Sequence, residues 1–166
     1  TQRIVTRTME SFDVSPDGKT IVFTALKDED NPRGGSCLWL MTDDGTRAWR
    51  MPNTDNGRHP AFSPDGRYIA YISRGLKDEF RQVFIAFAGG DARWQATASA
   101  FHKDWPCWSP DGRRLCYEAF VHGSETEYSE LFVVNADGTG ESRIMNPGKN
   151  SSGQWFTDSR PRWAAP

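Results

Sequence analysis

The chain has 166 residues, of which 37% are hydrophobic and 13% aromatic, enough for the packed core of one ordinary domain. Its 20 basic and 22 acidic side chains leave a net charge of −2, so no basic field would attract nucleic acid or an anionic membrane. The longest apolar run, 83–88, is far shorter than a membrane span, and the first residues do not resemble an apolar leader. We therefore expect neither nucleic-acid binding nor membrane insertion, and the compartment, periplasmic or cytoplasmic, stays open.

Three cysteines, Cys37, Cys107 and Cys116, are an odd and low number, which argues against a disulfide scaffold. Cys107 and Cys116 flank a predicted turn, and they could face each other across a hairpin. Because free cysteine is among the most often buried residue types, we favour the interpretation that both are small core side chains.

A four-residue motif, Ser-Pro-Asp-Gly, organises the chain. It begins at Ser15, Ser63 and Ser109, which are 48 and 46 residues apart, and a degenerate copy begins at Thr157. Self-similarity at this period predicts a repeat architecture. In such a turn proline presets φ, aspartate bonds nearby backbone and glycine supplies a positive φ. We therefore assign structural roles to the turn residues Pro16, Asp17, Gly18, Pro64, Asp65, Gly66, Pro110, Asp111 and Gly112.

Each repeat is predicted to form four short strands in up-and-down order. Residues 1–8 form a lone strand that is similar to the last strand of the later repeats. The predicted strands of the three full repeats are 11–14, 20–24, 37–41 and 47–51, then 59–62, 68–72, 82–87 and 92–97, then 105–108, 115–119, 131–134 and 141–145. A fourth unit stops after strands at 154–156 and 162–164.

The second strands of the repeats are apolar on both faces. Residues 68–72 and 115–117 lack the alternation of a strand with one wet face, so both of their faces are predicted to be buried. Small sheets stacked face to face around an axis bury both faces, which is the arrangement of a β-propeller. We therefore predict an all-β fold, an incomplete β-propeller of four-stranded antiparallel blades. It would be a single partial domain over 1–166, with repeats at about 9–52, 57–98, 103–146 and 152–166, the last completed by 1–8.

The repeats resemble the Pro-Asp, WD40-like β-propeller repeat of the bacterial TolB family. The resemblance is carried by Phe62-Ser63-Pro64-Asp65-Gly66 with Ile69-Ala70-Tyr71, and by Trp108-Ser109-Pro110-Asp111-Gly112 with the segment 132–138. The segment 87–93 equally resembles the N-terminal propeller of prolyl-oligopeptidase-type serine peptidases. The resemblance covers nearly the whole chain and implies the fold, whereas it leaves the function open between these two families.

Three full repeats and parts of a fourth fall short of the four to eight blades at which propellers usually close. Three explanations stay open. Two chains could form a homodimer that closes one ring of about eight blades, because two-fold symmetry is the commonest oligomer symmetry. Alternatively, the chain is a fragment of a longer propeller, or a minimal four-bladed ring that residues 1–8 close.

The sequence offers little catalytic or metal-binding chemistry. It has no Gly-x-Ser-x-Gly nucleophile motif, and His59, His102 and His122 are the only histidines that could serve as a general base. These histidines are too far apart to form a close metal-ligand pair, and the acidic segment 27–31 lacks the spacing of a calcium loop. We therefore expect no catalytic residue, no metal and no cofactor, and a chain that is not an enzyme.

Binding is instead expected on one face of the ring. The long connections, 27–35, 53–58, 74–81, 101–104, 121–130 and 146–153, all follow second or fourth strands, so they share one face, and loop variation over a rigid scaffold is where binding usually resides. The candidate partner-binding residues are Arg33, Arg58, His59, Lys77, Phe80, His102, Trp105, His122, Tyr128 and Lys149. The leading hypothesis is a non-catalytic TolB-like propeller that binds a protein or peptide. The alternatives are the substrate-gating propeller of a prolyl-oligopeptidase-like serine peptidase, and a propeller that binds a small ligand or glycan.

Overall fold

The computed structural model describes residues 11–26, 35–76, 79–120, 129–145 and 161–163. Every regular element in these residues is a β-strand, which agrees with the predicted all-β class. The strands are β1 (Phe12–Val14), β2 (Thr20–Leu26), β3 (Ser36–Thr42), β4 (Ala48–Arg50), β5 (Arg58–Phe62), β6 (Tyr68–Arg74), β7 (Arg81–Phe87), β8 (Arg93–Gln95), β9 (His102–Trp108), β10 (Arg114–Phe120), β11 (Ser129–Asn135) and β12 (Ser142–Met145). A search of the described residues for a helix able to span a membrane finds none.

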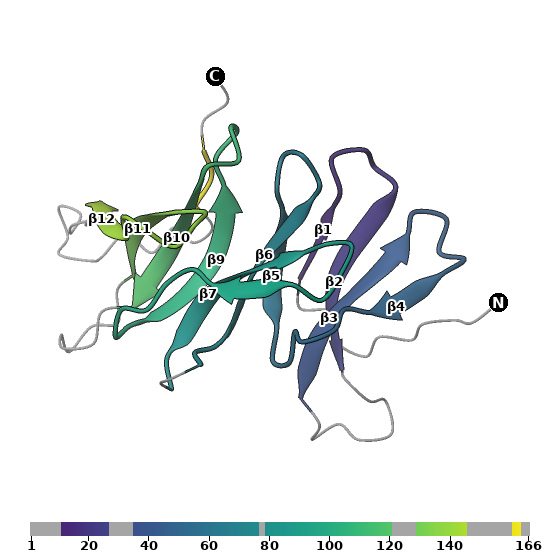
Figure 1. Ribbon diagram of the computed structural model, residues 1–166, viewed down its shortest axis with the longest axis horizontal. Coiled ribbons are helices and arrows are strands. Elements are labelled where there is room, and N and C mark those ends of the chain that lie inside the picture. The colour runs from purple at the N-terminus through teal and green to yellow at the C-terminus, as the bar shows by residue number, and fades with distance from the viewer. Residues whose placement is uncertain (1–10, 27–34, 77–78, 121–128, 146–160, 164–166) are drawn as a thin grey trace, which may run out of the picture.

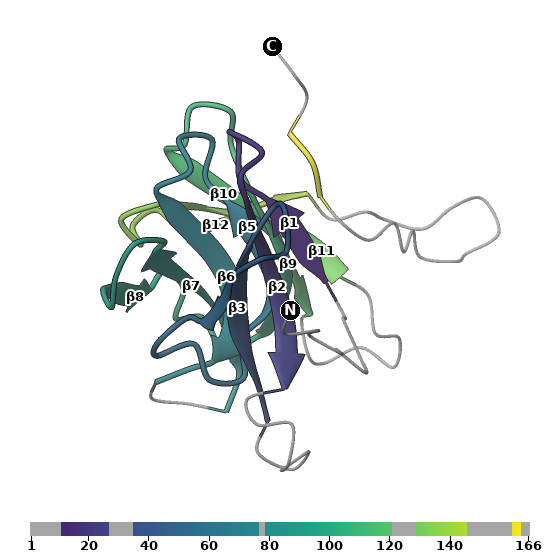
Figure 2. The same cartoon turned by 90° about the vertical axis from the view of Figure 1, so that its right-hand side faces the viewer.

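The strands form three four-stranded antiparallel sheets, each made of consecutive strands. The orders are β1-β2-β3-β4, β5-β6-β7-β8 and β9-β10-β11-β12, and we call these sheets blades 1, 2 and 3. Figure 1 shows them side by side in one row, with blade 2 between the other two, and Figure 2 shows the row nearly end on. The predicted up-and-down blades of an incomplete propeller are confirmed.

The Ser-Pro-Asp-Gly turns have the same geometry in all three blades. In blade 2 the Ser63 hydroxyl donates to Asp65 Oδ1 at 2.6 Å and accepts from the Tyr68 amide at 2.9 Å. Gly66 has a φ of 70°, a left-handed conformation that glycine adopts without strain. A Cβ on Gly66 would lie 3.4 Å from Cδ of Pro16, so the turn of one blade rests on the turn of the next.

The core lies between the blades rather than inside one sheet. On β6, Ile69 and Tyr71 face blade 1, whereas Ala70 and Ile72 face blade 3, and all four are fully buried. This alternation over the apolar residues 68–72 of β6 places the middle blade between two partners, as the sequence predicted. The blade 1 interface contains Val22, Leu38, Leu40, Met51, Phe62, Phe84 and Ala86 besides, and the blade 3 interface contains Val83, Ile85, Ala96, Leu115, Tyr117, Ala119 and Val134.

The outer surfaces of the row are less covered. Phe12 and Val14 on β1 are 60% and 43% exposed, and Ile144 on β12 is 56% exposed. Apolar side chains at both ends of the stack fit a propeller in which further blades continue the row.

Two strand predictions need correction. Residues 101–104 were predicted as a loop, but β9 already begins at His102. The pairing of β9 with β10 continues on both sides of a register shift between Cys116 and Glu118, so the strand reaches back to His102. Residues 162–164 were predicted as a strand, but 161–163 form none. The predicted strands at 1–8 and 154–156, and residue 164, lie outside the described residues.

Candidate functional site

Aromatic and ionic side chains gather at one edge of blades 2 and 3. In antiparallel blades the starts of the first and third strands share an edge with the ends of the second and fourth strands. Arg58 and His59 begin β5, Arg81 begins β7, the segment 102–105 begins β9, and Phe120 ends β10. This is the edge to which the sequence assigned the long connections. The residues that we call the inner-edge cluster are those just named at this edge together with Phe80, namely Arg58, His59, Phe80, Arg81, residues 102–105 and Phe120.

His59 and Trp105 form the centre of the cluster. They occupy equivalent positions in β5 and β9, and their rings stack with centroids 3.6 Å apart and planes inclined by 13°. Both residues have a φ of 49°, in a region that aromatic side chains rarely adopt. The His59 amide donates to Ser11 Oγ at 3.0 Å, and Ser11 precedes β1 at the equivalent position of blade 1. The unusual backbone therefore brings the innermost strands of successive blades into contact, and such outliers often mark functional sites.

Asp104 joins the histidine to an arginine. His59 Nδ1 is hydrogen-bonded to Asp104 Oδ1, and Arg81 Nη2 lies 3.8 Å from Asp104 Oδ2. The side chains of His59 and Asp104 are only 12% and 13% exposed, whereas that of Arg81 is 36% exposed. The ion pair thus leaves part of the guanidinium at the surface of the cluster.

The cluster also contains the aromatic rings of Phe80, His102 and Phe120. The Arg81 amide donates to His102 Nδ1 at 3.1 Å, and the Phe80 ring meets the His102 ring edge to face at 5.3 Å. The Arg81 guanidinium lies 6.0 Å from the centroid of the Phe120 ring, at the outer limit of a cation–π contact. Arg81 Nε is buried and has no hydrogen-bond partner within the described residues.

The structure brings together four of the predicted binding residues, His59, Phe80, His102 and Trp105, and places Arg58 beside them in β5. Five others, Arg33, Lys77, His122, Tyr128 and Lys149, lie outside the described residues. Sequence reasoning did not assign Asp104, Arg81 or Phe120 to the site. The repeat spacing held the missing signal, since Trp105 follows His59 by 46 residues and Asp104 directly precedes it.

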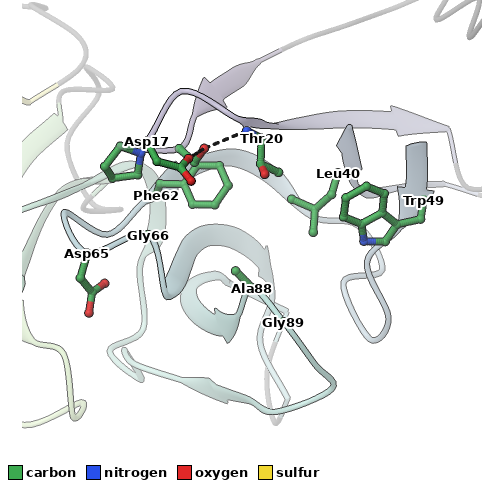
Figure 3. A pocket seen from close by; sticks show the side chains of 11 residues that line it. Asp17, Thr20, Leu40, Trp49, Phe62, Asp65, Gly66, Ala88 and Gly89 are labelled. Atoms are coloured by element: carbon green, nitrogen blue, oxygen red, sulfur yellow. Dashed lines mark hydrogen bonds between the residues drawn. The ribbon is translucent and has the colours of Figure 1, made fainter. Parts of the chain in front are cut away.

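The opposite edge carries the short turns and a cavity. The cavity has a volume of about 520 Å³ and lies between blades 1 and 2, and Figure 3 shows Asp17, Leu40, Trp49 and Phe62 around it. Two hydrogen bonds within the turn lower the pKa of Asp17. The one from the Ser15 hydroxyl has the larger effect, and the one from the Lys19 amide comes second. Both aspartates of the lining, Asp17 and Asp65, accept hydrogen bonds within their own turns, so they are less available to a ligand than the partly exposed Arg81 of the inner-edge cluster. Within the described residues, no group of three metal-binding side chains comes together.

Comparison with curated proteins finds fungal peptidases. The chain is 32% identical to dipeptidyl-peptidase 5 of Trichophyton schoenleinii over 145 residues, which is 76% of this chain and 19% of that protein. The same protein of Trichophyton equinum is 30% identical over 145 residues, again 76% of this chain and 19% of the relative. The chain therefore spans about one fifth of the length of these relatives. No protein-family model matches it.

These relatives contradict the expectation that the protein is not an enzyme. That expectation rested on the lack of a nucleophile motif among 166 residues. The relatives are named as peptidases, and a chain that aligns with only 19% of such a protein need not contain its catalytic residues. The missing motif was therefore no ground for excluding an enzyme.

Solved structures share the fold. TolB from Acinetobacter baumannii superposes with a TM-score of 0.65 at 18% identity, covering 84% of this chain and 33% of that one. A puromycin-hydrolyzing peptidase of Mycobacterium tuberculosis gives 0.64 at 13% identity, covering 86% of this chain and 22% of that one. Both resemblances that the repeats suggested are thus found, and the chain has the β-propeller fold that TolB and such peptidases have in common.

Proposed function

We propose that this chain is part of the propeller of a serine peptidase of the prolyl-oligopeptidase type, and that the whole protein releases dipeptides. The observation that carries the proposal is the 32% identity to dipeptidyl-peptidase 5 across the repeats. In such a protein the propeller admits and positions the peptide, and a separate domain supplies the nucleophile. This was the alternative, rather than the leading, hypothesis of the sequence analysis.

The inner-edge cluster has the chemistry to contact a peptide. Trp105 and Phe80 are half-buried rings, which can pack against apolar side chains of a substrate at a small cost in conformational entropy. The exposed part of the Arg81 guanidinium can donate to peptide carbonyls or to a carboxylate. Asp104 and His59 hold these groups in place, so the cluster is largely preorganised.

The test uses the full-length protein that contains this chain. We expect Trp105→Ala to lower kcat/KM for peptide substrates about tenfold, a loss of about 1.4 kcal/mol of transition-state stabilisation. The matched control is Trp49→Ala, since Trp49 is a half-buried tryptophan on the opposite edge, beside the cavity. Equal effects of the two substitutions on kcat/KM would contradict a role for the inner-edge cluster.

Closure of the ring is a separate proposal. The exposed Phe12 and Val14 at one end of the row, and Ile144 at the other, would be covered by further blades. Because the relatives are about five times longer than the aligned chain, we propose that these blades come from the same polypeptide rather than from a second copy. The homodimer of the sequence analysis remains a prediction, and light scattering of the isolated chain tests it against the monomer mass of 18.7 kDa.

A further inference from the structure

Two of the three cysteines lie directly opposite each other in blade 3. Cys107 on β9 and Cys116 on β10 are Cα partners in the antiparallel pairing. Directly opposed residues have Cα atoms about 4.5–5.5 Å apart, within the range of roughly 4.4–6.8 Å that a disulfide requires. Opposed side chains also leave the sheet on the same face, so the two sulfur atoms are neighbours without any backbone movement.

We propose that Cys107 and Cys116 are a redox-active dithiol that closes to a cross-strand disulfide. This site is independent of the peptidase proposal, because it lies in the sheet of blade 3 and not in the inner-edge cluster. Both cysteines are free thiols in the structure.

The face that carries these thiols is the one turned away from blade 2. Leu115, Tyr117 and Ala119 of β10 pack into the interface with blade 2, so the alternation of the strand turns Cys116 to the other side. Cys107 is half-buried there, whereas Cys116 is only 6% exposed. Within the described residues, Cys107 is therefore the more accessible of the two thiols.

The surroundings of the pair divide the roles between the two sulfur atoms. The hydrogen bond with the Cys116 thiol is the main cause that lowers the pKa of Cys107, against the opposing effect of burial, and the nearby Arg162 lowers it further. The same contact, with burial second, raises the pKa of Cys116. Because the thiolate is the nucleophile, Cys107 is the attacking cysteine and Cys116 the resolving one.

The reaction with a small disulfide, such as oxidised glutathione, balances in two steps. The Cys107 thiolate attacks one glutathione sulfur, the glutathione disulfide bond breaks, and one glutathione leaves as thiolate. Cys116 then loses its proton and attacks the Cys107 sulfur of the mixed disulfide, and the second glutathione leaves. Two protein thiols are oxidised to one disulfide, and one small disulfide is reduced to two thiols.

The experiment treats the native full-length protein with glutathione redox buffers, traps free thiols in acid and maps the peptides after trypsin digestion. Trypsin cleaves after Lys103 and Arg114, so Cys107 and Cys116 fall on different peptides that only a disulfide can join. We expect the joined peptides to increase with the ratio of oxidised to reduced glutathione, and the oxidised protein to unfold at a higher temperature.

Three variants make the test specific. Cys116→Ala should accumulate a glutathione adduct on Cys107, whereas Cys107→Ser should give neither adduct nor joined peptides. Cys37→Ser is the control, since Cys37 lies in β3 opposite Ala25 and should leave the reaction unchanged. The proposal is overturned if native protein forms no joined peptides at any buffer ratio, or if Cys107 stays unmodified in Cys116→Ala.

Discussion

Replacing Tyr71 and Tyr117 by phenylalanine tests whether the blade interfaces exclude water. Tyr71 lies between blades 1 and 2, Tyr117 lies between blades 2 and 3, and both are fully buried. Burial is the first cause that raises the pKa of each hydroxyl. At Tyr117 the Glu141 carboxylate, which accepts a hydrogen bond from the hydroxyl at 2.8 Å, raises the pKa further. The Arg93 guanidinium opposes this effect at Tyr71.

The raised pKa values of the two tyrosines determine how the stability of the fold changes with pH. Both tyrosines hold their protons in the folded state at pH values where the unfolded chain, with a tyrosine pKa of about 10, releases them. Stability is therefore fully present below about pH 10 and is lost as pH rises toward the folded-state pKa values. Because Tyr117 keeps its proton, it lowers the unfolding free energy by roughly 1.4 kcal/mol at about pH 11, and the raised pKa of Tyr71 adds a loss of the same sign.

Urea unfolding of the isolated chain between about pH 9 and 11 measures this loss. We expect wild type to lose at least roughly 1.4 kcal/mol more than the Tyr71→Phe/Tyr117→Phe double variant over that interval. The matched control, Tyr68→Phe, removes the hydroxyl of a half-buried ring at the interface that contains Tyr117. It keeps both fully buried tyrosines and should therefore still show the loss. If the double variant also follows the wild-type curve, water reaches these hydroxyls and the packed interfaces are wrong.

Three further substitutions test the packing, the turns and the cluster. Phe84→Ala should lower the unfolding free energy by about 3–5 kcal/mol because its ring is fully buried, whereas exposed Ile144→Ser should change it by less than about 0.5 kcal/mol. Ser63→Ala should cost about 1–2 kcal/mol in urea unfolding, since its hydroxyl bridges both ends of a turn, and no loss would show the turn to be dispensable. A double-mutant cycle of His59→Ala and Asp104→Ala should give a coupling of about 0.5–3 kcal/mol in thermal or urea unfolding, and strictly additive losses would argue against their hydrogen bond.

The sequence predicted the blades well because repeat spacing and turn chemistry are local signals. Ser-Pro-Asp-Gly marks the hairpin between the first two strands of each blade, and the doubly apolar strand at 68–72 reveals a sheet packed on both sides. These patterns fix element order and neighbours without any knowledge of long-range contacts.

The inner-edge cluster was predicted only in part because its contacts join residues of different blades. The His59 ring meets Trp105 through an unusual φ at both residues, which no propensity of histidine or tryptophan suggests. Asp104 was assigned to a loop, so its hydrogen bond to His59 and its ion pair with Arg81 could not be foreseen. The thiol pair was anticipated as a geometric possibility, because Cys107 and Cys116 flank a turn of known type.

The proposed peptidase function is tested most directly by the products of the full-length protein. Unmodified peptides of varied sequence would be incubated with it, and the fragments identified by mass spectrometry. The account predicts that dipeptides are released stepwise from the amino terminus, and that a serine-directed phosphonate abolishes the release. A folded full-length protein that leaves every peptide intact, or that the phosphonate does not inhibit, would contradict it.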